Sequence, residues 1–379
     1  MLGMNAFRYA VIRKSVMSAF LFLFAFALVS CGTTEHQGHG KNIMEHSDLL
    51  ALYERDGYDE VFVVDTQGKE VAHYVLVDRN DSTRRELPEG AIKIKVPLQN
   101  AIMDSEIYAG AFEELKSADV IKGMFDASYA TSPQVQNRIK EGSIVDLGQS
   151  SSPNAEKIVA MKPDAIMISF FEGMATQGID KLGVPIIKMY DLQESSPLGR
   201  AEWIKLIGRL AGKEEMADSI FDAVETAYDS VKENVKNLEG AWPKVLTETI
   251  YEGVWSVPGG MSYQAALLKD AGGKYFKEND NSPVSINLTA EQVLSEGGDA
   301  DIWLIRFYGD EEALKAILNA DPVYKDIKAY KDGNVYFSDT SSSGLFREFP
   351  FHPDLLLKDY SIIFSGDSIA KTRYFKKLN

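Results

Sequence analysis

Aromatic residues and arginines follow several short apolar segments of the sequence. Phe171 comes after one such segment, Trp255 lies shortly after another, and Arg306 follows a third. Aromatic faces hold flat or bulky ligands, and a guanidinium pairs with carboxylate or catecholate oxygens. Because ligands bind beyond the carboxyl ends of strands in α/β sheets, these positions are expected to line one binding cleft. The expected ligand contacts are Tyr129, Phe171, Glu172, Trp255, Tyr263, Arg306, Tyr308 and Arg347.

A structural interpretation competes with this one, since aromatic residues often pack inside a core. Trp255 and Arg306 are the stronger candidates for ligand contact, because an indole and a guanidinium are costly to bury without a partner.

Motifs for covalent or phosphate chemistry do not occur. The sequence contains no Gly-x-Ser-x-Gly, no Gly-x-x-x-x-Gly-Lys and no His-Glu-x-x-His. Beyond residue 46 only His73 and His352 remain, whereas transition-metal sites usually use several histidines or cysteines. We therefore expect no catalytic residues, no metal site and no cofactor. Two alternatives to a ligand-binding protein stay open: an exported α/β enzyme, and a scaffold lipoprotein that binds no small ligand.

The first thirty residues predict export. Three basic residues precede an apolar run from Val16 to Val29, which is too short to span a membrane and ends before Cys31. This pattern is typical of a lipoprotein signal, with Cys31 as the lipidated residue. Cys31 is the single cysteine of the 379 residues, so no disulfide can form within the chain. Gly32 to His46 is polar and reads as a flexible tether, and its three histidines are interpreted as part of a solvated linker.

The charge of the chain argues against nucleic acid as a partner. The formal net charge is -16, and no sustained block of Lys or Arg occurs. An acidic surface suits a basic partner or a cationic ligand.

Behind the candidate contacts lie the elements that must position them. Val61 to Val64 and Val71 to Val77 predict a hairpin, and short apolar strands then alternate with helical segments, which indicates an α/β fold. The predicted later strands are Ala165 to Ser169, Ile186 to Met189, Lys244 to Thr249, Asp301 to Ile305 and Asn334 to Phe337.

One long amphipathic helix separates the two groups of strands. Its apolar residues recur every three or four positions, acids lead it, lysines close it, and Gly240 and Pro243 follow. The predicted apolar stripe is Met216, Ile220, Val224, Tyr228, Val231, Val235 and Leu238. Such a rod would join two lobes and limit how far they move.

A weak repeat pairs Glu156 with Glu291. Each glutamate lies early in a helical segment that leads into a strand, and the second segment carries a capping-box pattern at Thr289 and Gln292. Ser152-Pro153 is interpreted as the start signal of the first. From the residues alone, an acid favoured at a helix start explains both glutamates.

Several stretches in this order resemble the helical-backbone class of periplasmic substrate-binding proteins, which serve ABC importers of iron-siderophores, haem and cobalamin. The resemblance runs from about Val96 to Gly366. It rests on Ile144 to Gly148, Ser152 to Ile158, Lys162 to Asp164, Ser256 to Gly260, Asp270 to Gly273, Leu288 to Glu291 and His352 to Asp359.

This resemblance implies two Rossmann-like α/β lobes joined by the rigid helix, with the ligand cleft between them. It also implies that Glu156 and Glu291 dock into basic pockets of the permease. Three ligand types stay open: a ferric siderophore held by Arg200, Arg306 and Arg347, a corrinoid, or haem. Axial ligands for haem would come from Tyr129, Tyr251, Tyr263 or His352.

The expected organisation is a monomer anchored by lipid to the periplasmic face of a bacterial membrane. The predicted segments are a signal peptide over 1–30, a tether over 31–46, an N-terminal lobe over 47–212, the helix over 213–240 and a C-terminal lobe over 241–379.

Overall fold

The fold was analysed in a computed structural model that describes residues 40–83, 86–171, 173–237, 242–367 and 369–379. The predicted signal peptide, Cys31 and Glu172 lie outside these residues. Within them, no helix combines the length and the apolar character needed to cross a membrane.

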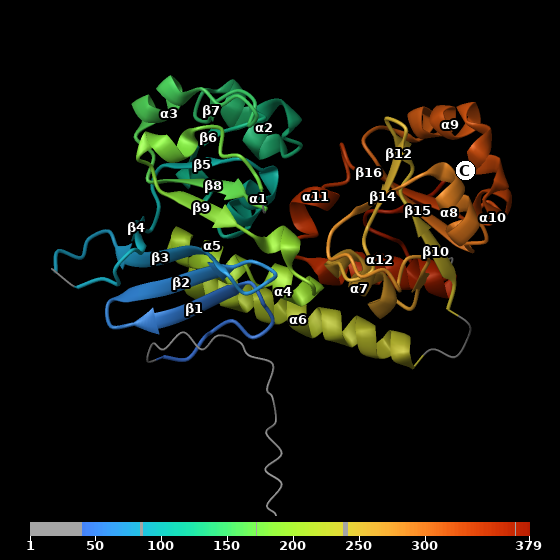
Figure 1. The fold of residues 1–379 in the computed structure, drawn as a ribbon, viewed down its shortest axis with the longest axis horizontal. Coiled ribbons are helices and arrows are strands. Elements are labelled where there is room, and N and C mark those ends of the chain that lie inside the picture. The colour runs from blue at the N-terminus through green and yellow to red at the C-terminus, as the bar shows by residue number, and fades with distance from the viewer. Residues whose placement is uncertain (1–39, 84–85, 172, 238–241, 368) are drawn as a thin grey trace, which may run out of the picture. The chain divides into compact units, whose positions relative to one another are not determined.

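A four-stranded sheet of order β1-β2-β3-β4 opens the described chain (Figure 1). The predicted hairpin forms its centre, where β2 and β3 pair antiparallel with Val61 opposite Tyr74. The Asp65 carboxylate closes the turn by accepting the amides of Gln67 and Lys69, both at 2.9 Å. One further strand lies on each side of the hairpin: β1 pairs with β2, and β4 pairs with β3. The strands are β1 (Leu50–Arg55), β2 (Tyr58–Val64), β3 (Glu70–Asp78) and β4 (Ile92–Val96).

Next comes a five-stranded parallel sheet of order β7-β6-β5-β8-β9. The predicted strands Ala165–Ser169 and Ile186–Met189 are β8 and β9 with the same bounds. Their near-continuous apolar runs suit a parallel sheet that is covered on both faces. The other strands are β5 (Ala101–Met103), β6 (Ile121–Met124) and β7 (Val145–Asp146), and the helices of this part are α1 (Glu106–Glu114), α2 (Pro133–Lys140) and α3 (Ala155–Met161).

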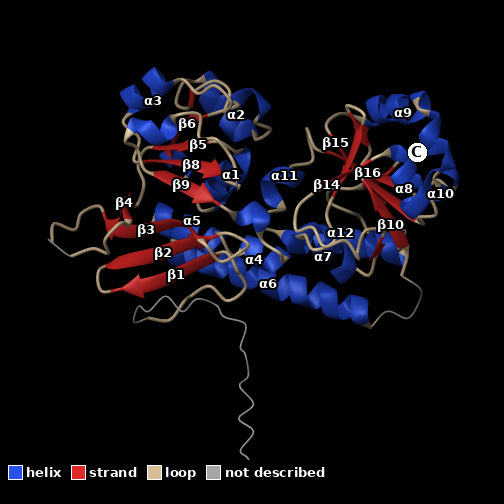
Figure 2. Ribbon diagram, viewed as in Figure 1, coloured by secondary structure: helices blue, strands red, loops and turns tan. Residues whose placement is uncertain are grey.

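A second five-stranded sheet, of order β13-β10-β15-β16-β17, follows the long helix α6 (Glu214–Lys236). Figure 2 labels its strands β10, β15 and β16. Its pairs are parallel except for β16 with β17. The predicted strand Lys244–Thr249 is shorter than expected, because Glu248 adopts a left-handed φ of 62° and ends the extended backbone. The strands are β10 (Lys244–Thr247), β13 (Lys274–Tyr275), β15 (Ile302–Phe307), β16 (Val335–Asp339) and β17 (Lys376–Lys377), and β11 (Ile250–Tyr251), β12 (Val254–Val257) and β14 (Ile286–Leu288) form a small antiparallel sheet.

The predicted long helix is α6 (Glu214–Lys236). It contacts α5 of the preceding part and α12 of the following part, and the Tyr228 hydroxyl donates to Asp270 on α7 at 2.8 Å. At 1.5 Å per residue its 23 residues span roughly 35 Å. The apolar stripe also includes Ala217 and Phe221, which the sequence analysis missed. The remaining helices are α4 (Pro197–Ala201), α5 (Ile204–Ala211), α7 (Tyr263–Asp270), α8 (Ala290–Gly297), α9 (Glu311–Ala320), α10 (Lys328–Lys331), α11 (Leu345–Glu348) and α12 (Pro353–Ser365), with short 3-10 turns between them.

Helix starts agree with the sequence in one lobe and differ in the other. The capping box of Thr289 and Gln292 is present at α8. At α3 the expected start at Ser152-Pro153 is wrong, because Asn154 is the N-cap and its side chain accepts the Lys157 amide at 3.0 Å.

The end of the predicted tether is not free of the fold. Glu202 on the N-terminal side of α5 accepts the backbone amides of Glu45, His46 and Ser47, and the His46 ring lies 2.6 Å from Glu225 on α6. The boundary expected at residue 46 is therefore too late, since buried carboxylates bind this stretch of backbone.

Candidate ligand-binding site

A hollow of about 280 Å³ lies between residues that precede α6 and residues that follow it. We call it the arginine hollow. Arg200 on α4 and Arg306 on β15 enter it from the two parts of the chain, and Tyr263 at the start of α7 lies with them. Its lining consists of Ile107, Leu192, Arg200, Glu248, Tyr263, Gln264, Arg306, Phe346, Phe349 and Pro350.

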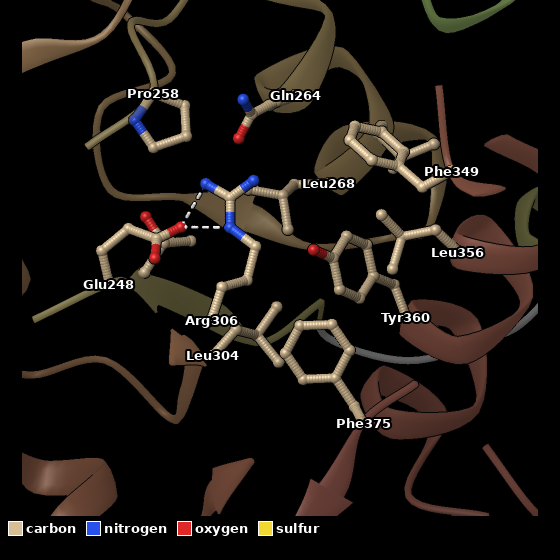
Figure 3. A pocket seen from close by; sticks show the side chains of 12 residues that line it. Glu248, Pro258, Gln264, Leu268, Leu304, Arg306, Phe349, Leu356, Tyr360 and Phe375 are labelled. Atoms are coloured by element: carbon tan, nitrogen blue, oxygen red, sulfur yellow. Dashed lines mark hydrogen bonds and ion pairs between the residues drawn. The ribbon is translucent and has the colours of Figure 1, made fainter. Parts of the chain in front are cut away.

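Arg306 is held by Glu248 at the carboxyl end of the second parallel sheet. The Arg306 Nε donates to Glu248 Oε1 at 2.6 Å, and Nη2 contacts the same oxygen (Figure 3). Glu248 is itself fixed, because its amide donates to the Leu304 carbonyl and its carbonyl accepts the indole N–H of Trp303. Burial favours the neutral guanidine, but the Glu248 charge outweighs it and raises the pKa of Arg306. Arg306 is therefore a fixed cation.

Behind Arg306 lies a small cavity of about 10 Å³, the size that holds about one water molecule (Figure 3). Tyr360 and Phe375 close it on one side, and Thr247 and Gln264 line it elsewhere. The tight fit around Arg306 leaves its guanidinium little room to change orientation.

Arg200 is the more deeply buried arginine of the hollow, with 2% of its surface exposed. Its Nε donates to Asp191 at 2.9 Å, and its Nη1 donates to the Tyr263 hydroxyl at 2.5 Å. The guanidinium also lies 4.7 Å from the centre of the Tyr263 ring. Among the described residues, Arg200 Nη2 has no hydrogen-bond partner. A buried donor without a partner is costly, so this atom is suited to an oxygen of a ligand.

A polar network continues from Arg200 into the first parallel sheet. The Tyr108 hydroxyl donates to Asp191 at 2.9 Å and lies 3.1 Å from the Ser169 hydroxyl. Burial raises the pKa of Asp104 to about 7, although the Ser169 amide, which donates to Asp104 at 2.6 Å, opposes the shift. Arg200 is thus anchored from behind by fixed groups of one lobe.

A second hollow of about 450 Å³ lies on the other side of the contact between α1 and α11. We call it the histidine hollow. The His352 Nε2 lies 2.9 Å from the Glu114 carboxylate, which joins α12 to α1. A Cβ on Gly110 would lie 2.5 Å from Arg347 Cγ, so only glycine permits this close approach. Its lining consists of Gly110, Ala111, Glu113, Glu114, Arg347, Glu348, Phe351, His352, Leu355 and Arg373.

The structure brings only some of the expected contacts together. Tyr263 and Arg306 line the arginine hollow, whereas Arg347 lines the histidine hollow. Phe171 and Tyr308 lie just past strand ends as expected, and Tyr129 lies in a 3-10 turn after β6. None of the three lines either hollow, and their exposed fractions are 50%, 65% and 66%.

Trp255 was expected to contact a ligand, but it lies in the core. It has no exposed surface, packs against Trp303 and Tyr324, and donates its indole N–H to the Thr247 carbonyl at 3.0 Å. This hydrogen bond to a backbone carbonyl offsets the cost of burying the indole N–H. The local sequence does not show that such a partner is present. Trp255 therefore belongs to the core and does not face a ligand.

Eight of the ten lining residues were not among the expected ligand contacts, and four of them are charged or aromatic. Arg200 was considered only as a cation for a siderophore, and Glu248, Phe346 and Phe349 were not considered. Glu248 could have been recognised as a candidate, because it lies near the end of a predicted strand, where ligands bind in α/β sheets. Arg200 has no such signal, because its position depends on how α4 packs. Among the described residues, no group of three or more His, Cys, Asp and Glu side chains could hold a metal ion.

Comparison with known proteins identifies the class. The family model described as "Periplasmic binding protein" matches residues 108–341, more than half of the chain. The chain belongs to this family, and the predicted resemblance to the helical-backbone proteins of siderophore and haem importers is confirmed. The predicted α/β fold with two lobes is confirmed as well.

Individual proteins of known sequence or structure are similar to this chain. An uncharacterized lipoprotein of Methanocaldococcus jannaschii is 26% identical over 88% of this chain and 82% of its own length. The iron-uptake system-binding protein of Bacillus subtilis is 29% identical over 50% of this chain and 59% of its own. Among solved structures, the triscatecholate siderophore binding protein FeuA of Bacillus subtilis, complexed with ferri-bacillibactin, covers 76% of this chain and 100% of its own with a TM-score of 0.58 and 21% identity.

Proposed function

We propose that this protein captures a ferric siderophore in the arginine hollow and delivers it to the permease of an ABC importer. The observation that carries the proposal is the pair of fixed arginines, one from each side of α6, that meet with Tyr263 and Phe346 in one hollow. Guanidinium groups bind chelate oxygens, and aromatic faces cover the flat ligand arms. The iron-uptake relative and the siderophore-bound structure support the same ligand class.

Several exposed aromatic residues lie outside the hollow. Tyr129, Phe171, Tyr251 and Tyr308 follow strands of the parallel sheets in sequence and expose half or more of their surface. We propose that a ligand larger than the arginine hollow also contacts some of them. Haem and a corrinoid are the other bulky ligands that this arrangement could accept.

Titration with chelates tests the proposed ligand class. Purified protein should bind at least one ferric siderophore, with a change in intrinsic fluorescence or a mass shift in native mass spectrometry. Because Trp255 is buried in the core, quenching by the ferric ion is a better signal than a change at that indole. If the protein bound no siderophore but bound haemin or a corrinoid, the siderophore assignment would be wrong, and the protein would serve a haem or corrinoid importer of the same class.

We also propose that Glu156 and Glu291 dock with the permease. Both are exposed in the first turn of their helices, α3 and α8, which belong to different lobes. The Thr289 hydroxyl and the Glu291 amide lower the pKa of Glu291, so this group is charged and available to a basic surface.

Transport reconstituted with the cognate permease tests this role. The double variant Glu156→Ala, Glu291→Ala should lose most uptake while its chelate affinity stays unchanged, because neither residue lines a hollow. Glu312→Ala, an acid in the first turn of α9, is the matched control and should retain uptake. Full uptake by the double variant would refute the docking role without affecting the ligand assignment.

The membrane anchor is a further part of the proposal. We propose lipidation at Cys31, which the lipoprotein relative supports, and we also propose a location at the periplasmic face of a bacterial membrane. Cys31→Ser should release the protein from the membrane fraction, and retention of the variant there would contradict the assignment.

A further inference from the structure

Each arginine of the arginine hollow already has a carboxylate bound to it. Arg306 is paired with Glu248, and Arg200 is paired with Asp191, which is fully buried behind it. Of the lining side chains, only Arg200, Glu248 and Arg306 are ionisable acids or strong bases. The lining thus carries two cations and one anion, and Asp191 behind Arg200 compensates the second cation, so these ion-paired groups together have no net charge.

The histidine hollow shows the same balance. Arg347 lies 3.3 Å from Glu348, and Arg373 lies 2.7 Å from the same carboxylate. Glu114 is bound to His352, and Glu113 adds a further acid. A ligand that extended from one hollow toward the other would again meet as many acids as bases.

This balance limits the charge of a ligand. A ferric tris-catecholate carries three net negative charges, since six catecholate oxygens surround one Fe³⁺, and its binding would need several uncompensated cations. A ferric tris-hydroxamate is uncharged, because three hydroxamate anions match one Fe³⁺. Glu248 and Asp191 would repel the first chelate at short range in a partly desolvated site, and the chain as a whole has a formal charge of -16.

Arg200 still offers a donor to a ligand. Arg200 Nη2 is buried and has no partner among the described residues, and its arginine lines the hollow. A single neutral or singly charged oxygen, such as a hydroxamate carbonyl or one carboxylate, would satisfy this atom.

We infer that the ligand carries at most one net negative charge, and that Glu248 excludes highly anionic chelates by neutralising Arg306. This inference rests on the proposed function and names the class of chelate within it: uncharged ferric hydroxamates, not ferric tris-catecholates. Glu248 acts as a specificity residue, because it sets the charge that the hollow presents.

Three probes test the inference on the wild-type protein: ferrichrome, an uncharged ferric tris-hydroxamate; ferri-bacillibactin, a ferric tris-catecholate; and haemin, which has one net negative charge. We expect ferrichrome to bind at least about tenfold more tightly than ferri-bacillibactin. Tighter binding of haemin than of ferrichrome would overturn the hydroxamate assignment. Affinity for ferrichrome should change by less than about twofold when the ionic strength rises from roughly 0.05 to 0.5 M, because an uncharged ligand is not screened.

Glu248→Gln tests the role of the carboxylate. The variant releases Arg306, so the affinity ratio of ferri-bacillibactin to ferrichrome should rise about tenfold. Glu296→Gln is the matched control: it removes a carboxylate bound to Lys277 at 2.8 Å, lies outside both hollows, and should leave the ratio unchanged. If Glu248→Gln fails to fold, the wild-type affinities and their salt dependence still test whether the hollow excludes highly anionic chelates.

The outcomes separate the inference from the proposed function. Tighter binding of ferri-bacillibactin by the wild type, or an unchanged ratio in a folded Glu248→Gln, would overturn the charge limit and leave siderophore capture standing. Binding of none of the three probes would count against chelate capture itself, and the inference would fall with it.

Discussion

The two hollows at the lobe boundary are built from the same kinds of side chain but are connected differently. In the arginine hollow each ion pair lies within one part of the chain: Arg200 with Asp191 before α6, and Arg306 with Glu248 after it. In the histidine hollow the pair of Glu114 and His352 joins the two parts. If the lobes separated, the ion pairs within one lobe would persist, whereas the pair of Glu114 with His352 and the hydrogen bond from Arg200 to Tyr263 would break.

This difference assigns separate roles to the two regions. The arginine hollow presents preorganised groups to a ligand, and preorganisation reduces the entropic cost of binding. The histidine hollow contributes to the contact of α1 with α11 and α12, where Gly110 permits the close approach of Arg347.

Removal of Arg200 should have the largest effect on stability. Arg200→Ala leaves Asp191 as a buried charge without its cation, and such losses cost about 3–5 kcal/mol in unfolding free energy. Arg373→Ala is the control from the other hollow, where the side chain is 54% exposed, and it should cost less than about 1 kcal/mol. Chemical denaturation measures both. Similar losses for the two variants would show that burial does not distinguish the hollows.

The pair between lobes should make stability depend on pH. Burial alone would lower the pKa of His352, but the hydrogen bond and charge of Glu114 outweigh it and raise that pKa above 6.5. A raised histidine pKa contributes stability that is complete below about pH 6.5 and is lost as the pH rises through the folded-state value.

Comparison of the wild type with His352→Gln isolates this contribution. The wild type should be more stable than the variant by roughly 0.5–1 kcal/mol at about pH 5.5, and the difference should shrink by about pH 8.5. Denaturant unfolding at both pH values gives the measurement. A difference that stays constant between the two pH values would mean that His352 acts by packing and not by charge.

Parts of this fold could be predicted because their signal is local. The strands β8 and β9, the hairpin of β2 and β3, and the capping box of α8 each follow from residues adjacent in sequence. The helix α6 was also evident from its periodicity, but its buried stripe was predicted too narrow, since Ala217 and Phe221 pack inward beside the expected Ile220.

The candidate site was less predictable because its signals are not local. Trp255 was expected in the cleft, but the carbonyl of Thr247 accepts its N–H inside the core. Arg347 was expected beside Arg306, but the packing of α11 on α1 turns it toward the histidine hollow. Tyr263 and Arg306 were expected together and do line one hollow. Strand ends can be recognised from sequence, whereas the partners of a buried polar group depend on tertiary packing.

The most direct test of the account is to bind a ferric siderophore to Arg306→Ala and Arg347→Ala side by side. Both variants remove one arginine that is paired with a glutamate at the lobe boundary, so they differ mainly in which hollow they change. We predict that Arg306→Ala weakens ferrichrome binding at least about tenfold and that Arg347→Ala stays within about twofold of the wild type. Equal losses, or a larger loss for Arg347→Ala, would contradict the placement of the ligand in the arginine hollow.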